Sequence, residues 1–421
     1  MKIEQLYHLY TQNYLIDTDT RNIRKGSIFF ALKGDNFNGN KFAEDALKNG
    51  ASFAIIDEDV YNQHPNTILV NNVLETLQKL AKYHRNQLKI PIISLTGSNG
   101  KTTTKELINC VLSKKYKTIA TTGNLNNHIG VPLTLLRINP TTQIGIIEMG
   151  ANHLNEIEFL SNIARPDFGL ITNFGKAHLE GFGSVEGVIK AKSELYDFLK
   201  ATNGIAFVNS EDAIQLKQSE GIKTITFNNN EIQFIEVNPF VKVTFKDISI
   251  QSKLIGKYNY NNIAAAIAIG NYFKVSINDI KNAIENYEPA NNRSQIINKG
   301  TLKIILDAYN ANPSSMIAAL ENFSALKDKH KIVILGDMFE LGENSKEEHQ
   351  QITDLASSLN FDNLILIGKA FSAINAKNAL TYTCFEDFKA SNKDLNLKNA
   401  TLLIKGSRGM ALERILNLFW F

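Results

Sequence analysis

Residues 94 to 103 read Ser94-Leu95-Thr96-Gly97-Ser98-Asn99-Gly100-Lys101-Thr102-Thr103. They follow an apolar segment that predicts a strand, and they precede a helix whose apolar residues between 107 and 112 recur at helical spacing. A glycine-rich turn in this context lets backbone N–H groups and a helix N-terminus surround phosphate oxygens. Lys101 would neutralise the β- and γ-phosphates, and the Thr102 hydroxyl would coordinate Mg²⁺. The stretch therefore predicts a phosphate-binding loop on an α/β sheet.

The spacing of this loop departs from the usual pattern at one position. In G-x-x-x-x-G-K-[ST] the first glycine would fall at Leu95. The alternative is a surface turn that merely precedes a helix. The strand–turn–helix context favours phosphate binding.

The middle of the chain alternates between apolar strands and helices, which is typical of a parallel sheet covered on both faces. An alternating pattern between residues 222 and 250 predicts an antiparallel patch, followed by helices over 261–273 and 277–286. The strands expected in the parallel sheet cover residues 91–95, 118–121, 143–148, 168–172 and 205–208.

A second strand–helix alternation begins near Arg293 and predicts a smaller doubly wound domain. Its expected strands cover 302–306, 331–335, 364–367 and 401–404, with helices opening at 313, 345 and 409. No G-x-G-x-x-G follows its first strand, so the sequence gives little support for dinucleotide binding there. At 421 residues the chain suggests two or three domains. We expect three α/β domains: 1–85, 86–290 and 291–421.

Two polar residues follow neighbouring strands of the predicted central sheet. Glu148 ends one strand, and His178 lies just beyond the next. Ligands bind at the carboxyl ends of such strands, and Mg²⁺ prefers oxygen ligands together with phosphate. Either residue alone is more often a capping or surface residue, but beside a phosphate-binding loop a metal role is favoured.

Other polar residues near the loop allow two interpretations. Lys192, on a predicted helix, is by default a solvated charge. Asn124, Asn126 and Asn127 are either turn residues or neutral donors that face a substrate.

Composition and charge exclude several functions. A net charge of +3 gives no reason to expect nucleic acid or an acidic membrane as partner. No apolar run reaches the roughly 18 residues needed to cross a bilayer, and the start lacks the apolar core of a signal peptide. Cys110 and Cys384 lie far apart, in no metal or redox spacing. We therefore expect a cytoplasmic protein without membrane insertion.

Together these motifs resemble the Mur ligase family. The general family pattern is present in the phosphate-binding loop, Glu148, the Ala177-His178 pair, Lys192 and residues 256–265. Residues 148–152, 307–313, 336–342 and 405–410 resemble the branch that adds D-alanyl-D-alanine to UDP-N-acetylmuramoyl-tripeptide. Two departures are Tyr258, where the family usually has histidine, and His128, where an acidic residue is more usual.

The resemblance implies an ATP-dependent carboxylate–amine ligase that makes a peptidoglycan precursor through an acyl phosphate. It implies ATP, two Mg²⁺ sites, a Lys192 that can be carbamylated, and a monomer. Its implied catalytic residues are Lys101, Glu148, His178, Lys192 and Asn127, with Thr102, Glu148, His178 and Lys192 on metal. The implied ATP-binding residues are Gly97, Ser98, Asn99, Gly100, Lys101, Thr102, Thr103, Asn259, Asn262, Arg293 and Asp307. Thr20, Arg21 and Asn38 would bind the UDP substrate, and Asn310, Asn312 and Ser407 would face D-alanyl-D-alanine.

Two rival functions remain open from the sequence. Another carboxylate–amine ligase, such as a different Mur enzyme or a folylpolyglutamate synthetase, would share the phosphate-binding loop with Glu148 and His178. A regulatory protein that only binds or hydrolyses ATP would tolerate the loss of Lys192 and the loop asparagines, which are all present.

Overall fold

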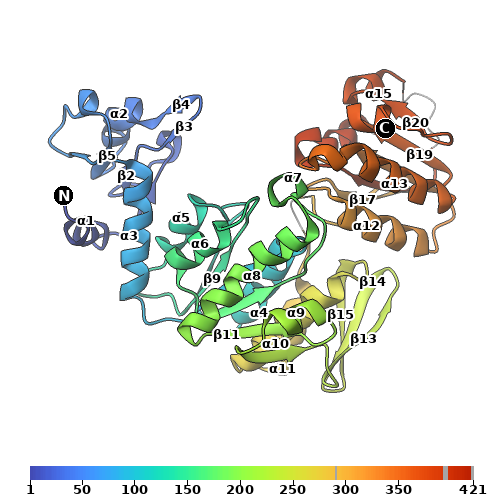
Figure 1. Cartoon of the computed structure of the whole chain (residues 1–421), viewed down its shortest axis with the longest axis horizontal. Helices are drawn as coiled ribbons and strands as arrows, with labels where there is room; N and C mark the ends of the chain where they lie inside the picture. The colour runs from blue at the N-terminus through green and yellow to red at the C-terminus, as the bar shows by residue number, and fades with distance from the viewer. Residues whose placement is uncertain (290–291, 392–396, 419–421) are drawn as a thin grey trace.

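The phosphate-binding loop leaves the carboxyl end of a central strand in an α/β protein of three domains (Figure 1). The computed structural model describes residues 1–289, 292–391 and 397–418. The boundary that we expect at 290/291 therefore falls on residues outside this description.

The middle domain is built on a six-stranded parallel sheet in the order β12-β11-β10-β7-β9-β8. All residues of β7 are buried, as expected for a strand covered on both faces. Helices α4, α10 and α11 pack on one face, while α5, α6 and α8 cover the other. The strands are β7 (Ile92–Thr96), β8 (Thr118–Ala120), β9 (Ile144–Glu148), β10 (Phe168–Ile171), β11 (Ile205–Asn209) and β12 (Lys223–Phe227). The helices are α4 (Lys101–Leu112), α5 (Gly130–Leu135), α6 (Glu156–Ala164), α7 (Leu179–Phe182), α8 (Val185–Thr202), α9 (Ala213–Gln218), α10 (Asn259–Tyr272) and α11 (Ile277–Asn286).

An antiparallel sheet of β13 (Ile232–Val237), β14 (Phe240–Phe245) and β15 (Ile248–Ile255) adjoins this domain. The antiparallel patch is thus confirmed, but its expected start at residue 222 is wrong. Residues of β12 pair in parallel with β11 and extend the main sheet instead. An alternating pattern alone could not show whether β12 belongs to the parallel sheet or to the antiparallel patch. An edge strand with one exposed face has the same period of two as a strand in a hairpin.

The N-terminal domain is a four-stranded parallel sheet in the order β1-β2-β5-β6, with a separate short hairpin. Helix α3 covers one face of this sheet and also packs on α5 and α6, so the two domains share one continuous apolar core. The elements are α1 (Ile3–Tyr10), β1 (Ile16–Asp17), β2 (Ile28–Phe30), β3 (Lys33–Gly34), β4 (Phe37–Asn38), α2 (Ala43–Lys48), β5 (Phe53–Ile56), β6 (Thr67–Leu69) and α3 (Val73–Gln87).

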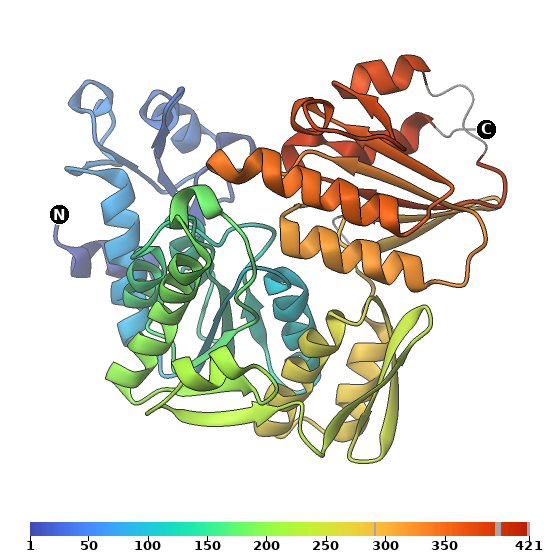
Figure 2. The ribbon, with the colours of Figure 1, turned by 45° about the vertical axis from the view of Figure 1, so that its right-hand side comes forward.

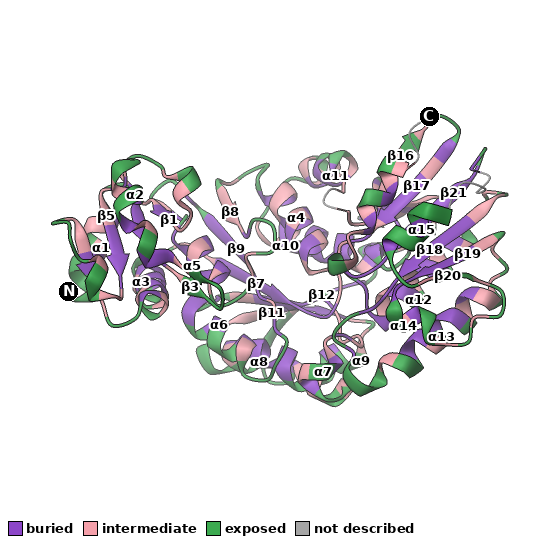
Figure 3. Ribbon diagram, turned by 90° about the horizontal axis from the view of Figure 1, so that it is seen from above, coloured by how far each residue is buried: buried purple, intermediate pink, exposed green. Residues whose placement is uncertain are grey.

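The C-terminal domain has a six-stranded sheet, β16-β17-β21-β18-β19-β20, in which only the edge strand β16 is antiparallel. Its four inner strands, β17, β21, β18 and β19, are mostly buried between two helical layers, whereas the edge strands β16 and β20 are partly exposed (Figure 3). The elements are β16 (Gln295–Lys299), β17 (Leu302–Asp307), α12 (Pro313–Ala325), β18 (Lys331–Gly336), α13 (Ser345–Ser358), β19 (Asn363–Ile367), α14 (Lys369–Ser372), β20 (Leu380–Tyr382), α15 (Phe385–Ser391) and β21 (Thr401–Lys405). The helix expected from Gly409 is instead two short 3₁₀ segments, Arg408–Met410 and Leu412–Leu418.

Candidate active site

The phosphate-binding loop is shaped by two glycines that no other residue could replace without strain. Gly97 has φ +142° and Gly100 has φ +79°, and both lie in the region that favours glycine. A Cβ on Gly97 would lie 2.0 Å from the Thr172 hydroxyl, and one on Gly100 would lie 2.7 Å from Asn262 Oδ1. The loop therefore packs between Thr172, which directly follows β10, and Asn262 of α10.

Lys101 begins α4 and folds back over the loop. Its Nζ donates to the carbonyl oxygens of Gly97 (2.6 Å) and Ser98 (3.3 Å). Burial lowers the pKa of Lys101 to about 8, against the opposing effect of the Glu148 charge. An anionic phosphate in the loop would restore a strong preference for the protonated amine.

Glu148 is the buried carboxylate of the site. Its Oε1 accepts hydrogen bonds from Thr102 Oγ1 (3.2 Å) and Asn126 Nδ2 (2.8 Å). Its Oε2 is buried without any hydrogen-bond partner. Burying a carboxylate oxygen without a partner costs free energy of folding, unless a cation binds to that oxygen. The pair of Thr102 and Glu148 therefore fits a hard divalent cation, even though no cluster of three acidic, histidine or cysteine residues occurs within the described ranges.

Lys192 and His178 both contact the aromatic ring of Phe182. The Lys192 Nζ lies 4.9 Å from the centre of the Phe182 ring and donates to the Ala151 carbonyl oxygen (3.1 Å). The His178 ring packs edge-on against the same ring. Burial holds the pKa of Lys192 well below its ordinary value, and the Lys101 charge acts in the same direction. Lys192 is thus a buried amine with a reduced tendency to be charged, and the default interpretation of a solvated surface lysine is wrong.

Residues of α10 and of the C-terminal domain face the phosphate-binding loop from the other side of the site. Asn262 accepts from Thr104 Oγ1 (3.0 Å) and donates to Asn259 Oδ1 (2.8 Å). The Arg293 guanidinium stacks 3.7 Å above the Tyr309 ring. The Asp307 carboxylate pairs with Lys405 (2.6 Å) and accepts from the Ser294 N–H (3.1 Å).

These groups line one cavity of about 790 Å³ between the middle and C-terminal domains. That volume is ample for a nucleotide and part of a second substrate. From our expected site, the cavity lining contains Ser98, Asn99, Gly100, Lys101, Thr102, Thr103, Asn127, Glu148, His178, Asn259, Asn262, Arg293, Asp307 and Asn310.

The C-terminal domain lies next to the middle domain (Figure 2). Polar contacts join the two domains beside this cavity. Asn312 Nδ2 donates to Asn99 Oδ1 (2.8 Å), and the Ser314 hydroxyl accepts from the Lys176 N–H (2.9 Å). Lys176 also pairs with Glu348 (2.8 Å).

Several expected residues have roles in the fold that the sequence did not reveal. Asn127 Oδ1 accepts from the Ile129 and Gly130 N–H groups, and it is Asn126 that reaches Glu148. Asn312 is the N-cap of α12. Ser407 is outside the cavity lining, and its hydroxyl accepts from the Phe339 N–H (2.9 Å).

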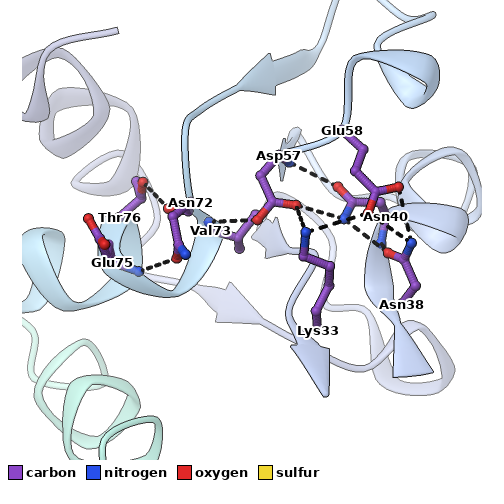
Figure 4. A network of polar contacts seen from close by, with 9 residues as sticks. All are labelled: Lys33, Asn38, Asn40, Asp57, Glu58, Asn72, Val73, Glu75 and Thr76. Carbon is purple, nitrogen blue, oxygen red and sulfur yellow. Dashed lines mark hydrogen bonds and ion pairs between the residues drawn. The ribbon is translucent and has the colours of Figure 1, made fainter. Parts of the chain in front are cut away.

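The three residues expected to bind the UDP substrate lie in the N-terminal domain and do not line the cavity. Arg21 is exposed and pairs with Asp19, while Thr20 accepts from Asn49 through its backbone carbonyl oxygen. Asn38 belongs to a polar network that joins the β3–β4 hairpin to Asp57 and the start of α3 (Figure 4). Its amide donates to Glu58, and its Oδ1 accepts from Asn40.

Three family models match the chain in sequence order. The model for the Mur ligase family catalytic domain matches residues 13–94, that for the Mur ligase middle domain matches 95–270, and that for the Mur ligase glutamate ligase domain matches 292–408. The chain is also similar to the UDP-N-acetylmuramoyl-tripeptide–D-alanyl-D-alanine ligase of Bacillus subtilis. The two are 36% identical over 419 residues, which cover 95% of this chain and 92% of that protein. The chain belongs to the Mur ligase family.

Other Mur ligases agree with this assignment. The corresponding ligase of Escherichia coli is 34% identical, over 95% of this chain and 92% of that protein. The crystal structure of MurF ligase from Thermotoga maritima in complex with ADP superposes with a TM-score of 0.85 at 27% identity, covering 98% of this chain and 97% of that one. MurF from Acinetobacter baumannii gives a TM-score of 0.84 at 30% identity, with the same coverage. Folylpolyglutamate synthase of Mycobacterium tuberculosis shares the fold alone, with a TM-score of 0.62 at 12% identity, over 83% of this chain and 95% of that one.

None of the described helices has the length and the apolar character that a bilayer crossing requires.

Proposed function

We propose that this Mur ligase joins D-alanyl-D-alanine to UDP-N-acetylmuramoyl-tripeptide, with conversion of ATP to ADP and phosphate. The product is the pentapeptide precursor of peptidoglycan. The observation that carries the proposal is the cavity in which Lys101, Thr102 and the half-satisfied Glu148 carboxylate meet. The similarity to ligases named for this reaction supports the choice of substrates.

The chemistry follows from the weakness of a carboxylate as an acyl donor. Its oxygen is a poor leaving group, so ATP first phosphorylates the carboxylate to an acyl phosphate. The amine then attacks the acyl carbon, and phosphate leaves through a tetrahedral intermediate. The protein contributes charge neutralisation and alignment.

The phosphate-binding loop neutralises the transferring phosphoryl group. The Lys101 amine, now held by the loop carbonyls of Gly97 and Ser98, would turn to phosphate oxygens when nucleotide binds. The first backbone N–H groups of α4, which begins at Lys101, would also donate to phosphate oxygens, as at other helix N-termini. Asn259 and Asn262 on α10 would lie beside the adenosine, with Arg293 and Asp307 near its ribose and phosphates.

Two magnesium sites fit the residues present. Thr102 and Glu148 would hold the first ion, consistent with the unpaired Oε2 of Glu148. His178 and a carbamylated Lys192 would hold the second, because a buried amine with a low pKa is largely neutral and can react with CO₂. Held by these residues, the cations would supply positive charge that offsets the negative charge of the phosphates and of the substrate carboxylate.

The remaining assignments complete the proposal. Asn127 lies at the rim next to the reacting phosphate, and Thr20, Arg21 and Asn38 contact the UDP moiety. Asn310, Asn312 and Ser407 lie on the side of the C-terminal domain that receives D-alanyl-D-alanine. We assign 1–85 to UDP-substrate binding, 86–290 to ATP binding and 291–421 to the acceptor. The enzyme acts as a monomer in the cytoplasm, where ATP and nucleotide-linked precursors are made.

The proposal is tested by mass spectrometry of a reaction with ATP, Mg²⁺, UDP-N-acetylmuramoyl-tripeptide and D-alanyl-D-alanine. We expect a product heavier by the dipeptide minus water, formed one-to-one with phosphate. Tripeptides with diaminopimelate or lysine at the third position should be compared in parallel. Phosphate release without this product would redirect the assignment to another carboxylate–amine ligase. Phosphate release that needs no carboxylate substrate would favour a regulatory ATPase.

A further inference from the structure

One contact of the C-terminal domain reaches a residue of the proposed metal site directly. The Nδ1 of His178 contacts the carboxylate of Glu340, which comes from the loop after β18. The backbone also takes part, because the Glu180 N–H donates to the Glu340 carbonyl oxygen (3.2 Å). Glu340 thus binds the 178–180 segment of the middle domain through both its side chain and its main chain.

The backbone at both ends of this contact adopts an unusual conformation. His178 has φ +52° and Glu340 has φ +61°, both in the left-handed region. A residue with a Cβ is strained in that region, and glycine would adopt it more easily. Such positions concentrate at functional sites, where the surrounding contacts offset the cost.

The contact also determines which imidazole nitrogen is left for other partners. The contact does not have the geometry of a hydrogen bond, and His178 Nδ1 is otherwise buried without a hydrogen-bond partner. A negatively charged carboxylate this close to Nδ1 repels a nitrogen lone pair and attracts an N–H, so it favours the proton on Nδ1 and leaves the lone pair on Nε2. His178 lines the cavity, whereas Glu340 does not. The nitrogen that remains for a ligand in the cavity is therefore Nε2.

We propose that Glu340 is a positioning residue that makes the second metal site depend on docking of the C-terminal domain. When the domain docks, its carboxylate fixes the His178 ring and tautomer, so that Nε2 can coordinate a cation. When the domain is away, the ring loses this partner and the site is incomplete. Carboxylates that accept from the second nitrogen of a metal-bound histidine have this effect in other proteins. The inference rests on the proposed function, because it takes His178 as a metal-site residue.

The chain offers variants that separate positioning from simple docking. Glu340→Ala removes the acceptor, and Glu340→Gln keeps an oxygen acceptor without the charge. Glu348→Gln weakens a different contact between the same two domains, the pair with Lys176, and leaves Glu340 in place. Glu343→Ala changes an exposed glutamate three residues away and serves as the neutral control. The Glu340 side chain is 51% exposed, so the fold should tolerate its replacement.

The first measurement is the tautomer of His178, read from ring-nitrogen NMR signals of ¹⁵N-histidine-labelled full-length protein. The His178→Gln spectrum identifies the His178 signals. We expect the Nδ1–H tautomer in the wild type and in Glu340→Gln, and a mixture of tautomers in Glu340→Ala. This readout needs neither metal nor turnover.

The second measurement is the Mg²⁺ concentration that gives half-maximal ligation. We expect Glu340→Ala to raise it by about 10-fold or more, with Glu340→Gln intermediate and Glu343→Ala unchanged. Unchanged tautomer and Mg²⁺ dependence in Glu340→Ala would overturn the inference. So would Glu348→Gln if it reproduced both changes in full, because Glu340 would then act through docking alone. Failure of the wild type to form the pentapeptide product would instead count against the proposed function, and the tautomer result would stand apart from it.

Discussion

The buried Glu148 lines the cavity together with Lys101, while the buried Lys192 lies against Phe182. The Glu148 carboxylate has an unpaired oxygen, while Lys101 and Lys192 rely on backbone carbonyl oxygens. Their charges are prepared for phosphate and cations rather than for one another. This is the arrangement expected of a site that stabilises charge during phosphoryl transfer.

Replacing Lys101 tests this interpretation at the level of one residue. We expect Lys101→Ala to lower the rate of product formation by about 10²–10³-fold or more, because it removes the loop's own cation from the transferring phosphoryl group. The measurement is ADP and phosphate release together with product mass. Lys114→Ala, an exposed lysine just beyond α4, is the matched control. Near-normal ligation by the Lys101 variant would contradict the assignment of the loop.

The phosphate-binding loop is an element whose shape is fixed by its neighbours. Gly100 is the N-cap of α4 and lies against Asn262 of α10, while the Ser98 N–H donates to the Asn173 carbonyl oxygen after β10 (3.1 Å). The loop therefore depends on two segments that follow it in the chain by about 75 and 160 residues. Leu95, where the usual spacing would place the first glycine, is a buried residue of β7.

A pair of glycine substitutions separates this packing from backbone strain. Gly100→Ala should weaken nucleotide binding by about tenfold or more, because the added methyl group would meet Asn262 as well as strain the backbone. Gly300→Ala, between β16 and β17, meets the same left-handed strain at φ +57° with no atom within 4 Å of the new Cβ. We expect it to cost about 1–2 kcal/mol of stability and to leave nucleotide binding intact. Calorimetric titration with ADP, alongside thermal melting, measures both effects. Equal loss of affinity in the two variants would show that the contact with Asn262 is unimportant.

At the scale of the whole molecule, the N-terminal and middle domains behave as one packed unit around α3. His84 of α3 is fully buried there, and its Nε2 donates to the Ile138 carbonyl oxygen (2.9 Å). The Tyr7 hydroxyl lies 3.3 Å from its Nδ1, and tyrosine rings surround the imidazole. This environment lowers the pKa of His84 to about 4, mainly through burial.

The free energy of unfolding should therefore decrease in mild acid. The folded protein keeps His84 neutral down to about pH 4, whereas the unfolded chain binds a proton near pH 6.5. Stability from this group is fully present above pH 6.5 and is lost as the pH falls towards 4. At pH 5 the loss is about 2 kcal/mol. Urea unfolding of wild type and His84→Gln at pH 7.5 and pH 5 measures it, and the variant should lose about 2 kcal/mol less between the two. The buried His349 also has a lowered pKa. It is present in both proteins, so its contribution to the pH dependence of stability cancels when the two are compared. Identical pH dependence in the two proteins would contradict the role of His84.

Most of the fold followed from local pattern. The helix expected over 277–286 has the same bounds in the structure, and the central strands end within a residue or so of their expected positions. Long periodic segments and buried apolar runs indicate their secondary structure without information from distant residues. The expectations were wrong at β12 and after Gly409, and they did not include the short edge strands β16 and β20. At these places the structure depends on which neighbour a segment meets.

The sequence by itself determined the phosphate-binding loop, the strand-end position of Glu148 and the alternation that makes three α/β domains, because these depend on residues close together in the chain. Only the tertiary structure decided that Asn126 rather than Asn127 reaches Glu148, and that Lys192 is buried beside Phe182. It alone placed Glu340 on His178, Asn312 on Asn99 and Arg293 on Tyr309. Those contacts join residues up to about 210 positions apart, and no local pattern specifies which distant side chains a domain interface will bring together.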